Sequence, residues 1–352
     1  MSTITPIHGR GAADNPPNRF IPLYREKLDT WIEEDDPAPV TRFFRDNTRT
    51  AMASNDSPDI PFNFSLNPYR GCEHGCIYCY ARPTHEWLSL SAGLDFESQI
   101  FVKEDLPDLL RKELSSPKWI PQSVSIGSVT DGYQPIERRV ELTRRCLQVF
   151  AEFKNPIGIV TKNALVTRDI DVLQELAAVN AAMVYVSVTT LDPDLARVME
   201  PRASTPAARL RAIEELTAAG IPVGVMNAPI IPGLNDHETP AILEACAKAG
   251  AISAGYVVVR LPFAVKDLFS AWLDQHFPSK KERVLGRLRE TRGGKLNDSR
   301  FGTRMRGEGE WAEVFREMFV LHRKRAGMVD RRVELSTAAF TNGRPVQRLL
   351  FE

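Results

Sequence analysis

Three of the chain's five cysteines share one short stretch, NPYRGCEHGCIYCYA, at positions 67–81. They are Cys72, Cys76 and Cys79, which stand four and three residues apart. Thiolates at these spacings can converge on one metal centre, whereas a disulfide framework would leave one of the five cysteines unpaired. We therefore expect these three residues to be metal ligands held by one loop.

Two kinds of metal centre suit three clustered thiolates. A structural zinc site needs four protein ligands, and here His74 or His85 would have to supply the fourth. With zinc bound in this way, the chain would be a zinc-stabilised nucleic-acid-binding protein without catalysis. A four-iron cluster held at three corners instead leaves one iron open to a ligand. Gly71 and Gly75 would let the backbone wrap closely around such a cluster, and Tyr78 would place an aromatic wall beside it.

The positions of the apolar segments predict which elements carry this loop. Runs of apolar and β-branched residues occur at 123–129, 157–162, 183–190, 222–230 and 256–261. Their starts are 34, 26, 39 and 34 residues apart, which is the length of a βαβ unit. Helical periodicity fills the intervals, and 61–72 supplies a first strand that runs into the cysteine loop. The pattern predicts an α/β fold in which six parallel strands form a partial (β/α)6 TIM-like barrel.

The sequence divides into three regions. Residues 1–60 are rich in Pro and Asn and have weak periodicity, so we expect an irregular N-terminal arm. Residues 61–265 form the predicted barrel, and residues 266–352 form a basic, helical C-terminal cap. In parallel α/β proteins, ligands bind at the carboxyl ends of the strands, on the loops that follow. The cysteine loop follows the first strand and therefore lies where chemistry is expected.

Charge is distributed unevenly along the chain. The 45 basic and 45 acidic residues cancel, but positions 280–352 contain 18 Lys or Arg and 10 Asp or Glu, a surplus of eight positive charges. This surplus suits a solvated helical face, or a surface that follows a phosphate backbone. No apolar run reaches the ~18–20 residues of a membrane span, and the first thirty residues lack the apolar stretch of a signal peptide. We expect a cytoplasmic protein with no membrane partner.

The cysteine spacing CxxxCxΦC, in which Φ is Tyr78, resembles the signature of the radical S-adenosylmethionine (SAM) superfamily. Over residues 61–265 the chain looks like the group that contains spore photoproduct lyase, which is often labelled DNA repair photolyase-like. The resemblance implies a 4Fe–4S cluster on the three cysteines and SAM as the second cofactor. It also implies a one-electron donor of the flavodoxin or ferredoxin type, with nucleic acid as a candidate substrate.

The resemblance also assigns residues around SAM. The segment IVTKN implies that Lys162 reaches the SAM carboxylate, and VSVTT implies that Ser187 contacts SAM. The segment ending in NAPII implies that the backbone near Ala228 faces the adenine. The SAM carboxylate calls for a nearby cation, and its ribose and adenine call for neutral hydrogen-bonding groups. Thr130 can supply another such neutral group.

Two groups of polar residues can each be interpreted as part of the site or as part of the structural framework. Arg209 either reaches the cofactor site or pairs at the surface with Glu214 or Asp194. The segment DGYQPIE opens into the predicted barrel mouth, and its candidate substrate contacts are Asp131, Tyr133 and Gln134. A strand-to-helix turn would explain these three residues nearly as well.

One position departs from the lyase pattern. Where the second strand of spore photoproduct lyase carries a cysteine that donates hydrogen to the repaired thymine radical, this chain has Ser128. A hydroxyl O–H bond is too strong to replace a thiol in that step, and Cys146 and Cys246 lie on predicted helices elsewhere. We therefore expect intact SAM cleavage with different substrate chemistry. Tyr78 and Tyr80 are the candidate catalytic residues for radical quenching.

Overall fold

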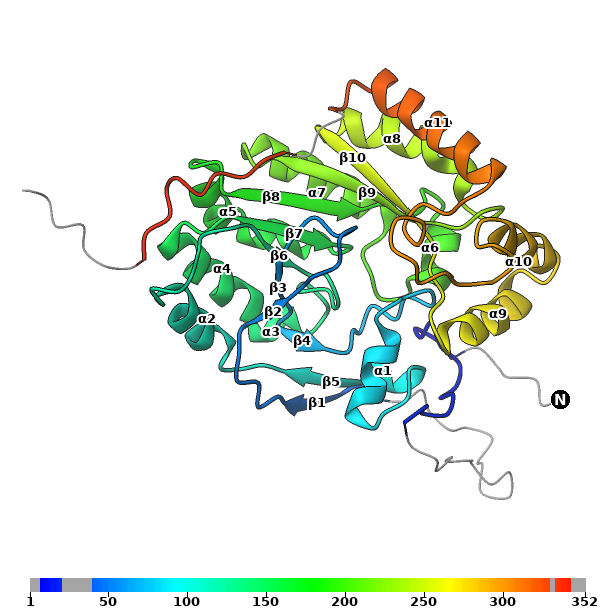
Figure 1. Ribbon diagram of the computed structural model, residues 1–352, viewed down its shortest axis with the longest axis horizontal. Helices are drawn as coiled ribbons and strands as arrows, with labels where there is room; N and C mark the ends of the chain where they lie inside the picture. Colours follow the sequence, from blue (N-terminus) through cyan, green and yellow to red (C-terminus); the bar gives the residue numbers. More distant parts are fainter. Residues whose placement is uncertain (1–6, 21–39, 330–332, 343–352) are drawn as a thin grey trace, which may run out of the picture.

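The computed structural model describes residues 7–20, 40–329 and 333–342. Its main sheet has seven strands in the order β10-β9-β8-β7-β6-β3-β2. The strands are β2 (Met52–Ser54), β3 (Phe64–Leu66), β6 (Val124–Ile126), β7 (Ile157–Thr161), β8 (Ala182–Ser187), β9 (Val223–Ile230) and β10 (Ser253–Val258). Six of these strands, from β3 to β10, are parallel, and β2 pairs antiparallel with β3 at one edge. The predicted partial barrel of six parallel strands is confirmed (Figure 1).

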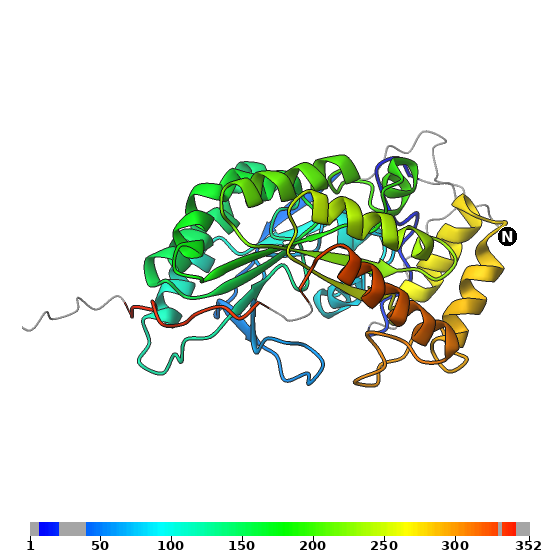
Figure 2. The ribbon, with the colours of Figure 1, turned by 90° about the horizontal axis from the view of Figure 1, so that it is seen from above.

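Helices connect the strands, and those drawn in green cover one face of the sheet (Figure 2). Their bounds are α1 (Leu94–Ser98), α2 (Leu106–Leu114), α3 (Glu137–Val140), α4 (Leu142–Phe153), α5 (Ile170–Ala177), α6 (Pro193–Met199), α7 (Pro206–Ala218) and α8 (Thr239–Lys248). In α4, Cys146, Phe150 and Phe153 stand at helical spacing and are buried in the core. Helical periodicity runs through residues 137–153 and predicts one helix there, but the chain turns at Glu141, whose φ of +50° separates α3 from α4.

A second sheet of three strands has the order β1-β5-β4. Its strands are β1 (Arg42–Arg45), β4 (Tyr69–Arg70) and β5 (Gln99–Val102), and β4 leads directly into the cysteine loop. The prediction of an irregular arm over residues 1–60 is therefore wrong at β1 and β2. Both strands are short and all of β1 is exposed, so neither carries the apolar alternation from which a strand is predicted.

The C-terminal region is helical over α9 (Val265–His276), α10 (Lys281–Glu290) and α11 (Glu310–Arg325), as predicted. Between α10 and α11 the chain returns to the barrel, where Val258 of β10 donates its N–H to Met305 O at 2.9 Å. Arg304 then pairs with Asp59 of the β2–β3 loop at 2.5 Å. The strands β2 and β10 are the two edges of the main sheet, which a partial barrel leaves unpaired with each other. Asp59 follows β2, and Met305, next to Arg304, is bonded to β10, so this ion pair links the two edges. Within the described ranges, no helix has the length and apolar character needed to cross a membrane.

Candidate active site

The three cysteines follow β4, the short strand that comes after the carboxyl end of β3, at the edge where ligands bind in this architecture. All three are free thiols, and Cys72 and Cys76 are buried whereas Cys79 is partly exposed. The loop glycines, Gly71 and Gly75, have φ values of +78° and +65°, in the left-handed region that favours glycine. The backbone turns expected from these glycines are therefore present.

Two neighbouring elements hold the backbone of the cysteine loop. The N–H of Cys72 donates to Phe96 O on α1 at 2.9 Å, and the N–H of Ile77 donates to Met199 O on α6 at 3.1 Å. Burial raises the pKa of the Cys76 thiol to about 12 and also raises that of Cys72. Thiolates at these positions therefore need a cationic centre beside them, as a bound metal or iron–sulfur cluster provides.

The two histidines near the cysteines do not extend this set of ligands. His74 is buried, with Nδ1 3.4 Å from Asp131 Oδ2 and Nε2 3.2 Å from the Asn163 amide. His85 Nε2 lies 2.9 Å from Gln99 O. Across the residues that the structure describes, no three His, Cys, Asp or Glu side chains form a group that could hold a single metal ion. The loop thus presents three thiols, and the identity of the centre that they hold stays a prediction.

Lys162 follows β7 and lies beside the cysteine loop, with Nζ 5.8 Å from the centre of the Tyr78 ring. Asp131 holds the backbone here, since its carboxylate accepts the Lys162 N–H at 2.8 Å and the Thr161 hydroxyl at 2.8 Å. Burial would raise the pKa of Asp131, but His74 and the backbone N–H groups of Lys162 and Tyr133 lower it to about 2. Lys162 is therefore held beside the cysteine loop, and its contact with the SAM carboxylate stays a prediction.

Glu200 is a buried carboxylate that the sequence analysis did not identify. Its Oε1 accepts hydrogen bonds from the Tyr78 hydroxyl and from Thr189 Oγ1, the latter at 2.7 Å, and its Oε2 pairs with Arg209. Burial opposes the charge of Glu200, but the charges of Arg209 and Lys162 and the two hydroxyl donors lower its pKa to about 2. Arg209 also donates to Ser187 O at 3.1 Å. Arg209 therefore turns inward, and the alternative of a surface ion pair is wrong.

The remaining predicted SAM contacts lie near the carboxyl ends of three strands. Ser187 ends β8, and Ala228 of β9 has its carbonyl 3.4 Å from Thr189 Oγ1. Thr130 follows β6, but its hydroxyl donates to Tyr69 O at 2.8 Å and is already used within the protein. The structure thus brings these residues to the edge that carries the cysteines, and their contacts to SAM stay predictions.

The three candidate substrate contacts, Asp131, Tyr133 and Gln134, lie against the cysteine loop. Gln134 Oε1 accepts the N–H of Glu73 at 2.9 Å, and Gln134 Nε2 donates to Gly71 O at 3.2 Å. The Tyr133 and Gln134 side chains are fully buried. These two residues do not line an open mouth, because the turn after β6 packs against the loop. This arrangement favours the alternative that the segment is a structural strand-to-helix turn.

Tyr80 is the more exposed of the two candidate catalytic tyrosines. Its side chain and backbone are 47% exposed, whereas Tyr78 is buried. The Tyr80 hydroxyl donates to Ser128 O, at the position where the lyase pattern has its cysteine. The Arg260 guanidinium, just after β10, lies 5.1 Å from the centre of the Tyr80 ring. Arg260 forms no ion pair with a carboxylate in the described part of the chain, and its Nε is buried without a hydrogen-bond partner.

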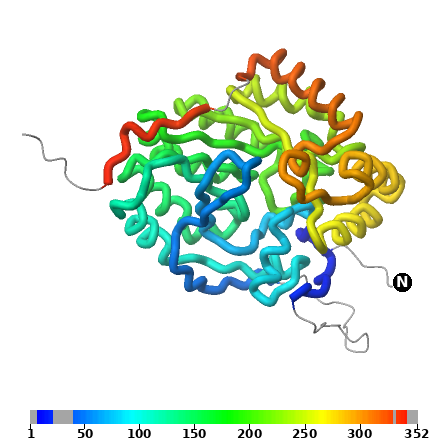
Figure 3. The backbone as a smooth tube through the Cα atoms, in the orientation of Figure 1, coloured from blue at the N-terminus to red at the C-terminus, as the bar shows by residue number. Residues whose placement is uncertain are grey.

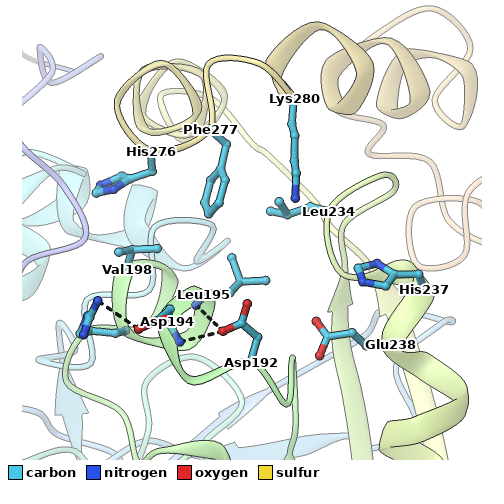
Figure 4. Close-up of a pocket in the computed structure, with 11 residues that line it drawn as sticks. Asp192, Asp194, Leu195, Val198, Leu234, His237, Glu238, His276, Phe277 and Lys280 are labelled. Carbon is cyan, nitrogen blue, oxygen red and sulfur yellow. Dashed lines mark hydrogen bonds and ion pairs between the residues drawn. The ribbon is translucent and has the colours of Figure 1, made fainter.

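A cavity of about 460 Å³ lies outside this site (Figure 4). It is surrounded by α6, the segment after β9, and the end of α9 with the chain that follows it. Its charged lining residues are Asp192, Asp194, Arg197, Glu238 and Lys280. Glu238 already accepts hydrogen bonds from Thr190 Oγ1 at 2.6 Å and Leu191 N at 2.8 Å. None of the loop cysteines lines this cavity, so it is separate from the candidate active site.

The fold and the site together define a class of protein. It is an α/β partial barrel that presents three cysteines on the loop after its first parallel strand, with a lysine at the end of a later strand. The family model described as "Radical SAM superfamily" matches residues 66–246, which is more than half of the chain. The chain belongs to the radical SAM superfamily.

The similar curated proteins carry names without an activity. "Uncharacterized protein Rv2578c" of Mycobacterium tuberculosis (strain ATCC 25618 / H37Rv) is 37% identical over 226 residues, which cover 64% of this chain and 66% of that protein. "Uncharacterized protein MJ0683" of Methanocaldococcus jannaschii is 31% identical over 175 residues, which cover 50% of this chain and 63% of that protein. The chain thus spans just under two thirds of the length of these relatives.

Solved structures of spore photoproduct lyase have a similar fold. The structure described as "Spore photoproduct lyase complexed with dinucleoside spore photoproduct" superposes with a TM-score of 0.58 at 15% identity, over 81% of this chain and 80% of that chain. At this level of identity the likeness establishes the fold, whereas substrate chemistry depends on the residues of the site.

Proposed function

We propose that this chain is a radical SAM enzyme in which Cys72, Cys76 and Cys79 hold a 4Fe–4S cluster. When bound, such a cluster supplies the electron that cleaves SAM to methionine and a 5′-deoxyadenosyl radical, which acts on the substrate. The observation that carries the proposal is the set of three free thiols on one glycine-shaped loop after β3. The chain itself binds and orients the cofactors and excludes water from them.

Anaerobic reconstitution with iron and sulfide tests this proposal. We expect about four irons per chain, absorbance near about 400 nm, and release of 5′-deoxyadenosine when dithionite supplies electrons. Stoichiometric zinc without that absorbance would contradict the proposal. It would support the alternative of a zinc-stabilised nucleic-acid-binding protein.

Lys162 is proposed to pair with the SAM carboxylate, with Thr130, Ser187, Arg209 and the Ala228 backbone around the rest of the cofactor. The substitution Lys162→Ala is expected to raise the Kd for SAM about 10- to 100-fold, because a hydrogen bond to a charged group contributes about 1.5–3 kcal/mol. Calorimetric titration of SAM into the reconstituted protein measures this change. Lys112→Ala, on the exposed side of α2, is the matched control and should leave the Kd unchanged.

An anionic substrate, with nucleic acid as the favoured class, is supported by three observations. Arg260 is a cation without a carboxylate partner in the described residues, and it lies beside Tyr80. Positions 280–352 carry the surplus of eight positive charges. The spore photoproduct lyase of similar fold is described as complexed with a dinucleoside. A small molecule or a protein side chain is the competing substrate class, favoured by Ser128 at the thiol position.

Binding of single-stranded oligonucleotides at several salt concentrations separates these substrate classes. For nucleic acid, log affinity falls linearly with log salt, and Arg260→Gln should reduce the magnitude of that slope by about one. Fluorescence anisotropy of a labelled oligonucleotide measures it. Arg197→Gln, an exposed residue of α6, is the control and should keep the slope. Absence of salt-dependent binding by the unaltered protein would favour a small molecule or a protein side chain.

Two further assignments complete the proposal. Of the two tyrosines, we assign the catalytic role to Tyr80, because Tyr80 is 47% exposed and lies beside Arg260, whereas Tyr78 is buried. The free cysteines suit a reducing compartment, so we infer a cytoplasmic enzyme without a membrane partner. Its one-electron donor would be of the flavodoxin or ferredoxin type.

A further inference from the structure

The N-terminal segment from Arg10 to Arg19, here called the arm segment, lies against the cysteine loop. In Figure 3 this dark-blue segment runs beside the cyan part of the chain that includes α1. Gly11 is buried and Ala12 is only 1% exposed, although the sequence predicts no regular structure here. Ala12 belongs to the same apolar cluster as Cys76. The arm segment is therefore part of the packed protein.

Glu97 connects the arm segment to the interior. Its carboxylate accepts the N–H of Gly11 at 3.0 Å and the N–H of Ala12 at 2.8 Å. The same carboxylate pairs with Arg82 at 2.5 Å, and both side chains are fully buried. A buried ion pair is stable only if further hydrogen bonds satisfy its oxygens and protons. For Glu97 the two amides of the arm segment provide these hydrogen bonds.

Arg82 connects Glu97 to the cysteine loop. Its Nε donates to Cys76 O at 3.0 Å, and its Nη2 donates to Gly75 O at 3.1 Å. Its Nη1 donates to Gly93 O at 3.0 Å. All three guanidinium nitrogens are thus used, and two of them hold the carbonyls of Gly75 and Cys76, which flank the Cα of Cys76. The ion pair with Glu97 holds this guanidinium in place.

The backbone of the arm segment also lies in direct contact with the backbone of the cysteine loop. A Cβ on Gly11 would lie 1.7 Å from Gly75 O, and a Cβ on Gly75 would lie 2.6 Å from Glu97 Oε2. Real Cβ atoms do not approach a backbone oxygen so closely, so any side chain at Gly11 must push the arm segment and the loop apart. Glycine at this position therefore permits a backbone contact that no other residue allows.

The other end of the arm segment is anchored to the elements after the loop. Asn18 Nδ2 donates to Glu86 O at 3.0 Å and to Leu90 O at 2.9 Å. Arg19 pairs with the buried Glu86 carboxylate at 2.6 Å. The arm segment is therefore anchored at two places, at Gly11 and Ala12 and again at Asn18 and Arg19.

We propose that the arm segment is a positioning element of the cluster site. Gly11 and Ala12 hold Glu97, Glu97 holds Arg82, and Arg82 sets the backbone that carries Cys76, the middle ligand. Groups that orient metal ligands without touching the metal typically change metal affinity 10- to 100-fold when they are removed. The inference rests on the proposed function, because it concerns how firmly the loop keeps its cluster. Gly11 and Glu97 are its positioning residues.

Iron release from the reconstituted protein to an excess of a ferrous chelator, under anaerobic conditions, tests the inference. Gly11→Ala is expected to release iron about 10-fold faster or more than the unaltered protein. Its visible circular dichroism, which reports the cluster environment, should also change while its far-ultraviolet spectrum is kept. Gly286→Ala is the control, because a Cβ there meets no atom within 4 Å, and it should release iron at the original rate.

A second variant covers the case in which Gly11→Ala does not fold. Glu97→Gln keeps the shape of the side chain but removes the charge opposite Arg82, and it too should accelerate iron release about 10-fold. If the unaltered protein binds no cluster, the proposed function fails. If it binds a cluster and both variants release iron as slowly as Gly286→Ala with unchanged visible spectra, the inference about the arm segment fails alone.

Discussion

Replacing Cys72, Cys76 or Cys79 singly with alanine is expected to abolish cluster binding and SAM cleavage. Three thiolates are the minimum that hold a four-iron cluster with one open iron. The other two side chains of the loop that could act as ligands already have partners: His74 is bound to Asp131 and Asn163, and Glu73 accepts the N–H of Ile136. Iron content after reconstitution should fall from about four per chain to less than about one, and dithionite-dependent 5′-deoxyadenosine should fall to background.

Cys246→Ala is the matched control for these three variants. Cys246 is a fully buried thiol on α8 in the main core, so its loss should cost about 1 kcal/mol of stability without removing iron. Retention of four irons and of SAM cleavage by any of the three loop variants would contradict the proposed site. Loss of iron in the Cys246→Ala protein as well would show that the assay reports stability and not ligation.

Glu200→Gln is expected to cause the second large effect, a loss of about 3–5 kcal/mol in the free energy of unfolding. Glu200 is fully buried, and its partner Arg209 is only 2% exposed. Neutralising the carboxylate leaves the guanidinium charge buried and uncompensated, and neither partner can reach water without unpacking β8 and α7. The Tyr78 hydroxyl also loses its ionised acceptor beside the cysteine loop. Urea unfolding of the apoprotein, compared with that of the unaltered chain, measures the change.

Asp194→Asn provides the comparison for this prediction. Asp194 pairs with Arg197 on the surface of α6, with side chains that are 78% and 73% exposed, so its removal should cost less than about 1 kcal/mol. Equal stabilities of the two variants would mean that the Glu200 pair does not hold the site together. Restoration of stability in a Glu200→Gln/Arg209→Met double variant would show that the uncompensated charge is the cause.

The main sheet could be predicted from the sequence because parallel strands are buried on both faces. Such strands appear as continuous β-branched runs, and the run predicted at 157–162 corresponds to β7, Ile157–Thr161. β1 could not be predicted, since all of its residues are exposed and its pairing with β5 is made by backbone groups. No sequence pattern marks the break at Glu141, because the apolar spacing continues across it.

Within the site, the sequence predicts the residues that are close together along the chain, but not the contacts between residues that are far apart along it. The cysteines and the loop glycines belong to one segment, so their spacing limits how their atoms can converge. Glu200 is 122 residues from Tyr78 along the chain, and Gly11 is 86 residues from Glu97, so no local pattern relates them. Gln134 was assigned to an open mouth because the sequence places it after a strand end, whereas packing turns it onto the loop.

The sequence by itself determined the ligand set and the order of the elements. Both follow from covalent spacing: cysteines four and three apart remain close in any fold, and β-branched runs at regular intervals have few ways to bury themselves. Only the tertiary structure decided which charges meet, that Arg209 turns inward to Glu200, and that Gly11 touches Gly75. The physical reason is desolvation. A carboxylate needs a specific cation or amide only after packing has removed its water, and which groups share that dry interior depends on the whole chain.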